Sequence, residues 1–395
     1  MKVLRYILIF LFTLVILLLV NQYLFCPRFQ FYQSAPFKGD SIYNPYKSAK
    51  PDHWVKCNFH AHARSWKGMT NGHGTANDVH SAYKALKYGV HCISNYHSID
   101  TTGSFEKSYI PAYEHGYNIN KTHQLVLGSK KVQWLDYLFP QTIHNKQDVL
   151  NHLREVNSIT ILNHPELRKG YLDSDFQSLS GYDCMEVLNP SVISTNQWDA
   201  DLSAGKKTFI VGNDDLHNVI TKDRLGKMCT FVNVQENRKD LVLKALKSGN
   251  SYGVVIGDSQ NVDSIPYLKS LQIRNGIVTI DLSRPAREIV ITGQNGKAIQ
   301  SFTNIEKAVF AIDKKDHYAR ATCTYDNGTQ LFLNPVFYTD DHDSTLAAVP
   351  ENILETMLFR ALGVVILFTW LFLVGKLVQW KKADRHSRQW AFFKL

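Results

Sequence analysis

The sequence predicts a mixed α/β protein: a parallel α/β sheet or barrel, then a small antiparallel β-sandwich, flanked by two transmembrane helices. Three observations support this prediction. Short apolar, strand-like runs alternate with helical patterns between about Val55 and Val255. From about Tyr267 to Tyr338, short strand-like runs are separated by turn sequences, and each end of the chain carries a long apolar segment. At 395 residues the chain is long enough for two domains.

The N-terminal segment from Tyr6 to Pro27 contains no charged residue over 22 positions. A helix of this length crosses a hydrocarbon core of about 30 Å. A cleaved signal peptide is the alternative. No small-residue cleavage site follows, and Phe25 is too bulky for a lipoprotein signal before Cys26. We therefore predict an uncleaved anchor over residues 1–27 and a proline-containing linker over residues 28–50.

A second apolar run extends from Met357 to Gly375 and is interrupted only by Arg360. A buried C-terminal helix is the alternative. Trp370 and Trp380 flank its lower end, and a basic cluster follows, which favours a span at residues 356–376 with a cytoplasmic tail at 377–395. Lys2 and Arg5 likewise predict a cytoplasmic N-terminus. Two spans with both termini inside place the region between them outside the cytoplasm, in the periplasm if the source is bacterial.

The formal net charge of +9 does not indicate a nucleic-acid partner. From residue 376 onward, six basic residues and one acidic residue account for +5, and Lys2 with Arg5 adds +2. The rest of the chain is nearly neutral, which argues against nucleic-acid binding. The six cysteines form no CxxC pair and are interpreted as buried apolar residues, with one or two disulfides as the alternative. The sequence does not indicate an oligomeric state.

Two regions between the spans have different periodicities. In residues 51–258, apolar side chains recur at helical spacing in three segments, at Val79–Leu86, Val149–Val156 and Leu241–Leu246. In residues 265–345, short strand-like runs alternate with Asn-Gly turns at 275–276, 295–296 and 327–328, which predicts the small β-sandwich.

Histidine is concentrated in the first of these regions, where 13 of 16 lie between His53 and His217. Several follow strand-like runs, and the carboxyl ends of parallel strands converge on one face of a barrel. These segments, together with the strand-like run Tyr182–Leu188 that carries Glu186, predict a shared metal site with the candidate ligands His60, His62, His97, Glu114, His123, His164, Asp215 and His217. The remaining histidines are interpreted as surface or core residues, among them His53, His80, His91, His115, His144 and His152.

The spacing of these residues suits metal binding. His60 and His62, two positions apart on a strand, project from the same face, and Asp215 and His217 repeat this spacing. Glu114 has two carboxylate oxygens and is expected to bridge two ions. Imidazole and carboxylate ligands together suit zinc, manganese or iron, and the lack of cysteine ligands favours a catalytic site over a structural one.

In this order, the motifs resemble those of the polymerase and histidinol phosphatase (PHP) superfamily of metal-dependent phosphoesterases. The resemblance covers about residues 55–255, and the nearest branch is the secreted or membrane-attached one that includes carbaryl-hydrolase-like proteins. It implies a distorted seven-stranded (β/α) barrel that holds two or three divalent metal ions. Asn71-Gly72 stands where the family has Asp-Gly. Where the family has Asp-His, this chain has Asn95-Tyr96-His97, so either His97 takes the ligand role one position late or that metal position is weakened.

By this resemblance the leading functional hypothesis is hydrolysis of a phosphate ester, with a small-molecule or phosphorylated substrate. Arg64 and Arg168 would neutralise phosphate oxygens, or else be solvated loop residues. Asp214 would orient a ligating histidine. Two alternatives stay open: a carboxyl ester or amide hydrolase that uses the same ligands, and a catalytically degenerate binding or scaffold module.

Overall fold

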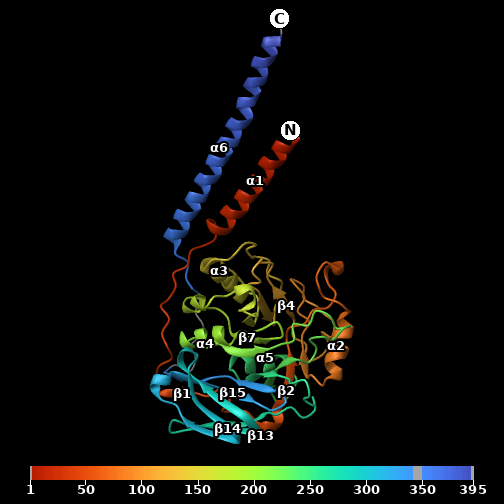
Figure 1. Cartoon of the computed structure of the whole chain (residues 1–395), viewed down its shortest axis with the longest axis vertical. Coiled ribbons are helices and arrows are strands. Elements are labelled where there is room, and N and C mark those ends of the chain that lie inside the picture. Colours follow the sequence, from red (N-terminus) through yellow and green to blue (C-terminus); the bar gives the residue numbers. More distant parts are fainter. Residues whose placement is uncertain (1, 341–348, 393–395) are drawn as a thin grey trace.

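The computed structural model describes the backbone of residues 2–340 and 349–392, and the side chains of residues 3–340 and 349–378. A folded body of two sheets with surrounding helices carries two long helices that project from one side (Figure 1). The predicted mixed α/β class is confirmed.

The larger sheet has eleven strands within the described residues. Its main order is β1(Ser41–Tyr43)-β17(Val336–Thr339)-β15(Tyr318–Thr324)-β16(Gln330–Leu333)-β11(Ser251–Val255)-β10(Met228–Asn233)-β2(Trp54–Asn58)-β3(Val90–His91). β12(Leu268–Arg274), β13(Ile277–Thr292) and β14(Ala298–Ala311) join this sheet through β13, which pairs with β15.

The smaller sheet has six strands in the same described part of the chain. Its order is β4(Ala112–His115)-β5(Gln124–Leu127)-β6(Ile159–Leu162)-β7(Cys184–Asn189)-β8(Val192–Ile193), and β9(Phe209–Gly212) pairs with β7. β9 also packs against β10 and β11 of the larger sheet. Gly212 permits this close approach, because a Cβ there would lie 2.8 Å from the Cys229 carbonyl oxygen.

The strand directions are mixed, so the expected closed, parallel (β/α)7 barrel is not confirmed. The β2–β3, β6–β7 and β7–β9 pairs are parallel, whereas β4–β5, β5–β6, β2–β10 and β10–β11 are antiparallel. The length of the loop that joins β4 to β5 determines the relative direction of these two strands. It covers only residues 116–123, which is too short for a parallel crossover, so the two strands must run antiparallel.

Four helices pack on the body: α2(Ala76–Ala85), α3(Ile143–Arg154), α4(Thr195–Ser203) and α5(Lys239–Lys247). Capping boxes begin α2 at Thr75 and α3 at Thr142. The apolar positions predicted from helical spacing face the core, where Val79, Leu150 and Val242 are fully buried. Short 3₁₀ turns occur at Pro51–His53, Trp66–Gly68, Leu167–Lys169, Asp173–Gln177, Gln294–Gly296 and Lys314–Asp316.

The C-terminal β region is joined to the first region by continuous strand pairing, and its division as a separate sandwich domain stays a prediction. β16 pairs with β11 across the expected boundary between residues 258 and 265. β1, which lies in the expected linker, pairs with β17. Arg320 also forms a buried ion pair of 2.6 Å with Asp199 of α4. The Asn-Gly turns at 275–276, 295–296 and 327–328 lie between strands, as expected.

Two helices, α1(Lys2–Tyr23) and α6(Ile353–Phe392), run side by side away from the body (Figure 1). Trp370 Nε1 donates to Thr13 Oγ1 at 3.0 Å, and Arg360 Nε donates to the Phe25 carbonyl at 3.1 Å. Both contain candidate membrane spans, at residues 3–23 and 353–378. Because only 6% of the second span is buried, the alternative of a buried C-terminal helix is disfavoured. The side chains of most of the basic tail, from residue 379, lie outside the described residues.

All six cysteines are buried and unpaired, which supports their interpretation as small core residues.

Candidate metal centre

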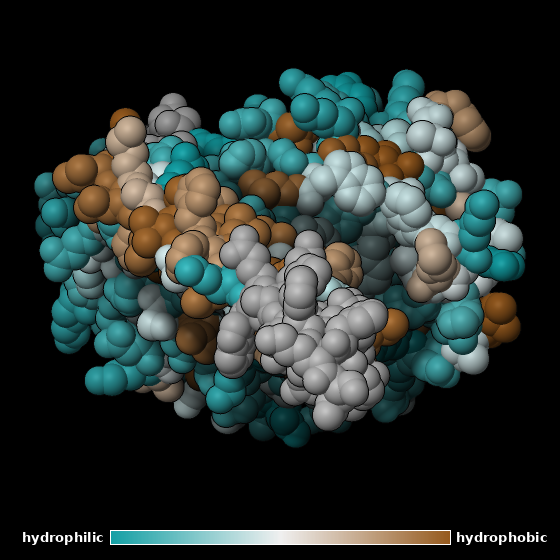
Figure 2. All heavy atoms as spheres, turned by 90° about the horizontal axis from the view of Figure 1, so that it is seen from above, coloured by the Kyte–Doolittle hydropathy of each residue, from teal (hydrophilic) through white to brown (hydrophobic). Residues whose placement is uncertain are grey.

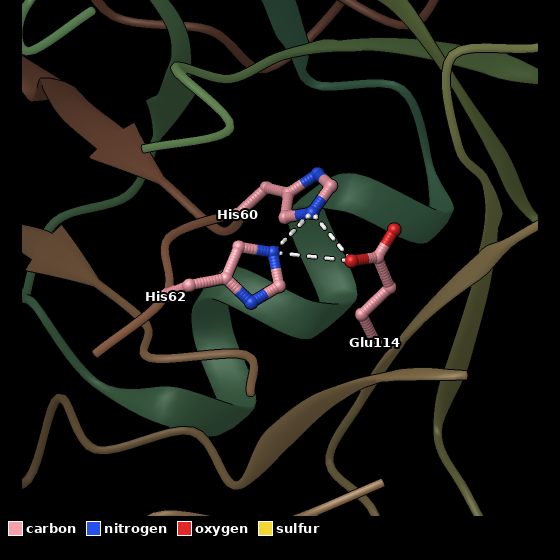
Figure 3. Close-up of side chains that lie close together, drawn as sticks. All are labelled: His60, His62 and Glu114. Carbon is pink, nitrogen blue, oxygen red and sulfur yellow. Dashed lines mark hydrogen bonds and ion pairs between the residues drawn. The ribbon is translucent and has the colours of Figure 1, made fainter. Parts of the chain in front are cut away.

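Seven of the eight candidate ligands converge on one centre. Their ligand atoms form three overlapping groups, in each of which all atoms lie within 4.8 Å of one another. Figure 3 shows His60, His62 and Glu114 with their ligand atoms turned toward a common point. The groups are His60–His62–Glu114, His62–Asp215–His217 and Glu114–His123–His164.

A backbone contact between two distant motifs places four of these residues together. The chain beyond β2 runs parallel to the chain beyond β9, with a bridge between Ala61 and Leu216 and a 2.7 Å hydrogen bond from His62 N to the Leu216 carbonyl. The HxH and DxH motifs therefore lie side by side. Asp215 and His164 have positive φ angles of 44° and 29°, a strained backbone conformation that is common at functional sites.

The first group has the dimensions of a metal coordination shell. His60 Nε2 lies 3.2 Å from His62 Nε2, 3.2 Å from Glu114 Oε2 and 3.2 Å from Asp215 Oδ1. Ligands bound at about 2.0–2.1 Å are about 3.3 Å apart at a tetrahedral angle and about 3.0 Å apart at an octahedral angle. His62 Nε2 completes the set at 3.1 Å from Glu114 Oε2 and 3.7 Å from Asp215 Oδ1. We call these four ligand atoms site A.

Glu114 faces a second group with its other oxygen. Its Oε1 lies 2.8 Å from His123 Nδ1 and 3.4 Å from His164 Nε2. We call these three atoms site B. One buried carboxylate thus points one oxygen at each site, which is the arrangement of a bridging ligand between two ions.

The third group shares ligand atoms with site A. Asp215 Oδ1 lies 3.2 Å from His217 Nε2, and the rings of His62 and His217 stack at 4.5 Å. Because one imidazole nitrogen binds one ion, His62 does not serve two ions at once. His217 is thus either a further ligand at site A or the beginning of a third site.

The chemistry of site A requires a cation. His60 Nδ1 lies 2.9 Å from Glu186 Oε1, so it donates its proton there and Nε2 is left as a lone pair. This lone pair faces the oxygens of Glu114 and Asp215. Glu114 Oε2 is buried and has no hydrogen-bond partner. Electron-rich atoms that converge in this way repel one another unless a positive charge lies between them, and a divalent metal ion fits this requirement.

The charges of the cluster alter its pKa values. Burial lowers the pKa of His60, but the nearby carboxylates of Asp215, Glu186 and Glu114 outweigh this effect and raise that pKa well above its usual value. Burial raises the pKa of Glu114, yet His60 and His123 hold it well below its usual range. The raised pKa values of His60 and His62 reflect carboxylates that favour positive charge at these two nitrogens, which is the charge that a divalent ion would supply.

Glu186, which the sequence places on a converging strand but not among the candidate ligands, contacts one of them. It lies on β7, fully buried, and orients His60. Asn213 Nδ2 donates to Glu186 Oε1 at 3.0 Å, and Asn189 Nδ2 donates to Oε2 at 3.0 Å. A carboxylate that holds the other nitrogen of a ligating histidine fixes its tautomer and orientation.

His97 lies outside the centre, which corrects the expectation that it is a ligand. Its Nε2 accepts a hydrogen bond from Gly116 N at 3.1 Å, its Nδ1 lies 3.2 Å from the Gln133 carbonyl, and its ring stacks on Trp134. Tyr96 instead faces the cluster and stacks on His62 with ring centroids 4.7 Å apart. The β-bridge between Tyr96 and Glu114 determines that Tyr96 faces the cluster and His97 faces away, because successive side chains of an extended chain point to opposite faces.

Asp214 does not orient a histidine, and this expectation is also corrected. Its carboxylate accepts hydrogen bonds from the backbone N–H groups of Gly226, Lys227 and Met228, and from the Tyr83 hydroxyl. Asp214 thus holds the entry to β10 in place, while its neighbour Asp215 faces the metal centre.

Three arginines differ in their relation to the centre. The structure gives Arg64 and Arg168 no contact with the cluster: both are exposed, and Arg168 donates to the Ile119 carbonyl. Arg224, which the sequence did not single out, donates to Asp215 Oδ2 at 3.2 Å and to Ser191 Oγ at 2.8 Å. Its guanidinium group is thus in contact with a candidate ligand.

The other histidines lie apart from the centre, in agreement with their interpretation. His80 and His91 pair with each other at 2.8 Å, and His115 bonds to Gln124 and Leu135. His144 accepts from Phe29 N, and His152 bonds to its own helix. In the Asn71-Gly72 segment, Asn71 and His73 are exposed and Gly72 packs against the Ala63 carbonyl.

Comparisons with known proteins give one distant likeness. No family model matches the chain, and no curated protein matches it. Among solved structures, the chain is similar to a two-domain protein from Bacteroides vulgatus that contains a predicted PHP-like metal-dependent phosphoesterase. The TM-score is 0.39 at 13% identity, over 75% of this chain and 99% of that chain. The functional conclusion therefore depends on the geometry of the metal centre.

Proposed function

We propose that this chain is a metal-dependent hydrolase that cleaves phosphate esters at a centre of two divalent ions, of which zinc, manganese and iron fit the ligands. The observation that carries the proposal is the position of Glu114, whose two oxygens face separate groups of histidine nitrogens at 2.8–3.4 Å. Site A and site B would each hold one ion. A third ion would require a further ligand, and Tyr96 stands where the resemblance to the PHP superfamily expects one.

Bound ions of this kind supply Lewis acidity and a hydroxide nucleophile at neutral pH. The residues of the chain have separate tasks. Glu186 holds His60 in the tautomer that presents Nε2 to site A. Arg224 lies at the outer edge of the cluster with a side chain 34% exposed, where its guanidinium would pair with a phosphate oxygen of the substrate. Tyr96 covers the ring of His62 and limits the access of water from that side.

We further propose that α1 and α6 anchor the hydrolase in a membrane with both termini on the cytoplasmic side. The helices leave the body side by side and both ends point the same way, which supports this arrangement (Figure 1). The basic residues at both ends of the chain support the cytoplasmic side.

The proposal is tested on the full-length protein in detergent, stripped of metal by a chelator and reloaded with manganese or zinc. We expect about two equivalents of metal and turnover of an aryl phosphate or a bis-aryl phosphate. A His60→Ala/His62→Ala variant should lose about one equivalent and the turnover, whereas the surface variant His152→Ala should keep both.

Two outcomes contradict the proposal in different ways. Turnover of an aryl acetate alone would favour the carboxyl ester hydrolase that the carbaryl-hydrolase-like branch suggests. Fewer than about 0.5 equivalents of metal, with no gain on adding manganese or zinc, would favour a binding or scaffold module.

A further inference from the structure

Three loops beside the metal centre expose an unusual set of large apolar side chains. We name this set the apolar rim: Trp66, Met69, Tyr117, Ile119, Trp134 and Leu138. Met69 is 83% exposed and Trp134 is 56% exposed. Isolated exposed apolar residues are ordinary, but a connected group of them indicates a contact surface.

The members of the apolar rim are held together by direct contacts. Trp66 and Trp134 meet edge to face with ring centroids 6.0 Å apart. Ile119 N donates to the Leu138 carbonyl at 3.0 Å, and the Tyr117 hydroxyl donates to the Asp136 carbonyl at 2.8 Å. The segments 66–69, 117–119 and 134–138 therefore form one continuous surface.

The apolar rim is fixed to the end of α1, where the candidate span finishes. Gln22 Nε2 donates to the Phe139 carbonyl at 2.9 Å, and Phe139 N donates back to Gln22 Oε1 at 2.9 Å. The Tyr23 hydroxyl donates to the Pro140 carbonyl at 2.9 Å. Because the candidate span ends at Tyr23, these bonds would hold residues 139–140 at the level of the lipid headgroups if α1 crosses a bilayer. Leu138 is one residue away, a Cα distance of about 3.8 Å.

The composition of the apolar rim suits a lipid surface. Tryptophan and tyrosine are enriched at the membrane interface, where the ring is apolar and its N–H or O–H group stays hydrated. Lys130 and Lys131 are exposed shortly before Trp134, and cations at this level attract anionic headgroups. Figure 2 views the molecule from the side on which the two apolar helices project, so these helices point toward the viewer.

The apolar rim also borders the metal centre. Trp66 Nε1 donates to the Tyr96 carbonyl at 2.7 Å, and Tyr96 stacks on His62. Tyr117 follows three residues after Glu114 in the sequence. A molecule held in the lipid surface at the apolar rim would thus have its polar head near the candidate ligands.

We infer that the apolar rim rests on the lipid bilayer and that the substrate is an amphiphilic phosphate ester presented from that bilayer. The substrate class rests on the proposed function, whereas the lipid contact does not depend on catalysis. The partner that covers the apolar rim is the same bilayer that α1 crosses.

The lipid contact is tested with the full-length protein in vesicles of phosphatidylcholine and phosphatidylglycerol. All six native cysteines are buried, so a Leu138→Cys variant presents one accessible thiol for an environment-sensitive fluorophore. The matched control is Val309→Cys on β14, a 48% exposed apolar position on a strand that lies at the end of the body opposite the helices (Figure 1). Lipids with a quencher near the headgroup should quench the label at 138 at least twofold and leave the label at 309 unchanged. Equal behaviour of the two labels, or failure of the protein to float with the vesicles, would overturn the contact.

The substrate class is tested on the same protein with metal added. Long-chain phosphatidic acid and phosphatidylglycerol in vesicles are compared with their soluble short-chain analogues. Leu138→Asp should lower the ratio of the long-chain to the short-chain rate at least tenfold, and Val309→Asp should not change it. An unchanged ratio for Leu138→Asp overturns the amphiphile as substrate. A quenched label with no hydrolysis of any ester overturns the proposed function and retains the lipid contact.

Discussion

Glu186 lies 2.9 Å from Nδ1 of His60 and thereby turns the other ring nitrogen, Nε2, toward Glu114. This relationship links two strands of different sheets, because Glu186 lies on β7 and His60 follows β2. The carboxylate is itself held by two asparagine amides, so the imidazole has one orientation.

Glu186→Gln should weaken metal binding by about 10- to 100-fold, the usual effect of losing the carboxylate behind a ligating histidine. Three donors converge on Glu186, from His60, Asn189 and Asn213. A glutamine has only one acceptor oxygen, so one donor would face its amide N–H group. Competition with a chromophoric chelator measures the affinity. Glu106→Gln, a neutralised carboxylate near the surface, serves as the control, and equal affinities in the two variants would contradict the role of Glu186.

Glu114→Gln should reduce the metal content from about two equivalents to one or fewer. The amide keeps one oxygen and replaces the other with an N–H donor, so it coordinates at one site and repels a cation at the other. Elemental analysis of the full-length protein after dialysis gives the stoichiometry. Retention of two equivalents would show that the sites are independent of this carboxylate and that the bridge is absent.

The loss of stability at high pH that His60 and His62 cause in the apoprotein should disappear when metal is bound. Nearby carboxylates raise the folded-state pKa values of His60 and His62, so above about pH 6.5 the folded apoprotein binds more protons than the unfolded chain. The stability that these histidines contribute is therefore full below about pH 6.5 and is lost as the pH rises through the raised pKa values. Metal requires neutral histidines, so the loaded protein should gain stability as the pH rises toward about 6.5, where the unfolded histidines lose their protons. Above that pH these histidines are neutral in both states, and their contribution to the stability of the loaded protein should stay level. Chemical denaturation of both forms at several pH values checks this, and parallel slopes would contradict it.

The candidate site was predictable from the sequence where the ligands follow strand-like runs. Short motifs at the ends of strand-like runs predict metal ligands whether the neighbouring strands are parallel or antiparallel. These motifs contain His60, His62, His164, Asp215 and His217. The sheet itself was less predictable. The turn at residues 116–123 reverses the chain, and the sequence contains no distinct signal that separates this hairpin from a short βα loop.

Glu186 and Arg224 were missed as site residues for different reasons. Glu186 is an isolated charge in the apolar strand Cys184–Asn189, and a buried acid needs a partner, so the sequence held a signal that could have identified it. Arg224 lies nine residues after Asp215, in an irregular loop. This loop has no helical or strand periodicity from which the contact between the two side chains could be predicted. A shift of one residue decides whether the side chain of Tyr96 or that of His97 faces the metal centre. The bridge between Tyr96 and Glu114 determines this position, and the sequence alone does not show the bridge.

His97→Gln should leave the metal content unchanged, in contrast to the loss expected for His62→Gln. His97 is bonded to the backbone at Gly116 and Gln133 and stacked on Trp134, so its removal loosens a loop and leaves the ligands in place. Elemental analysis of the two variants side by side measures this. Loss of one equivalent of metal from the His97 variant would show that His97 is a metal ligand.

Arg224→Met should raise the KM for a phosphate ester about tenfold or more, because a charge-assisted bond to a phosphate oxygen contributes roughly 1.5–3 kcal/mol. The same substitution should leave the KM for a neutral aryl acetate nearly unchanged, since that substrate has no anionic oxygen to pair. Methionine fills much of the volume of the arginine stem, and Arg224→Lys restores the charge without the planar fork, so it should recover part of the loss. Steady-state kinetics on both substrates separate the two effects. An equal rise in KM for the acetate would mean that Arg224 acts through Asp215, whose Oδ2 it contacts at 3.2 Å, and not on the substrate.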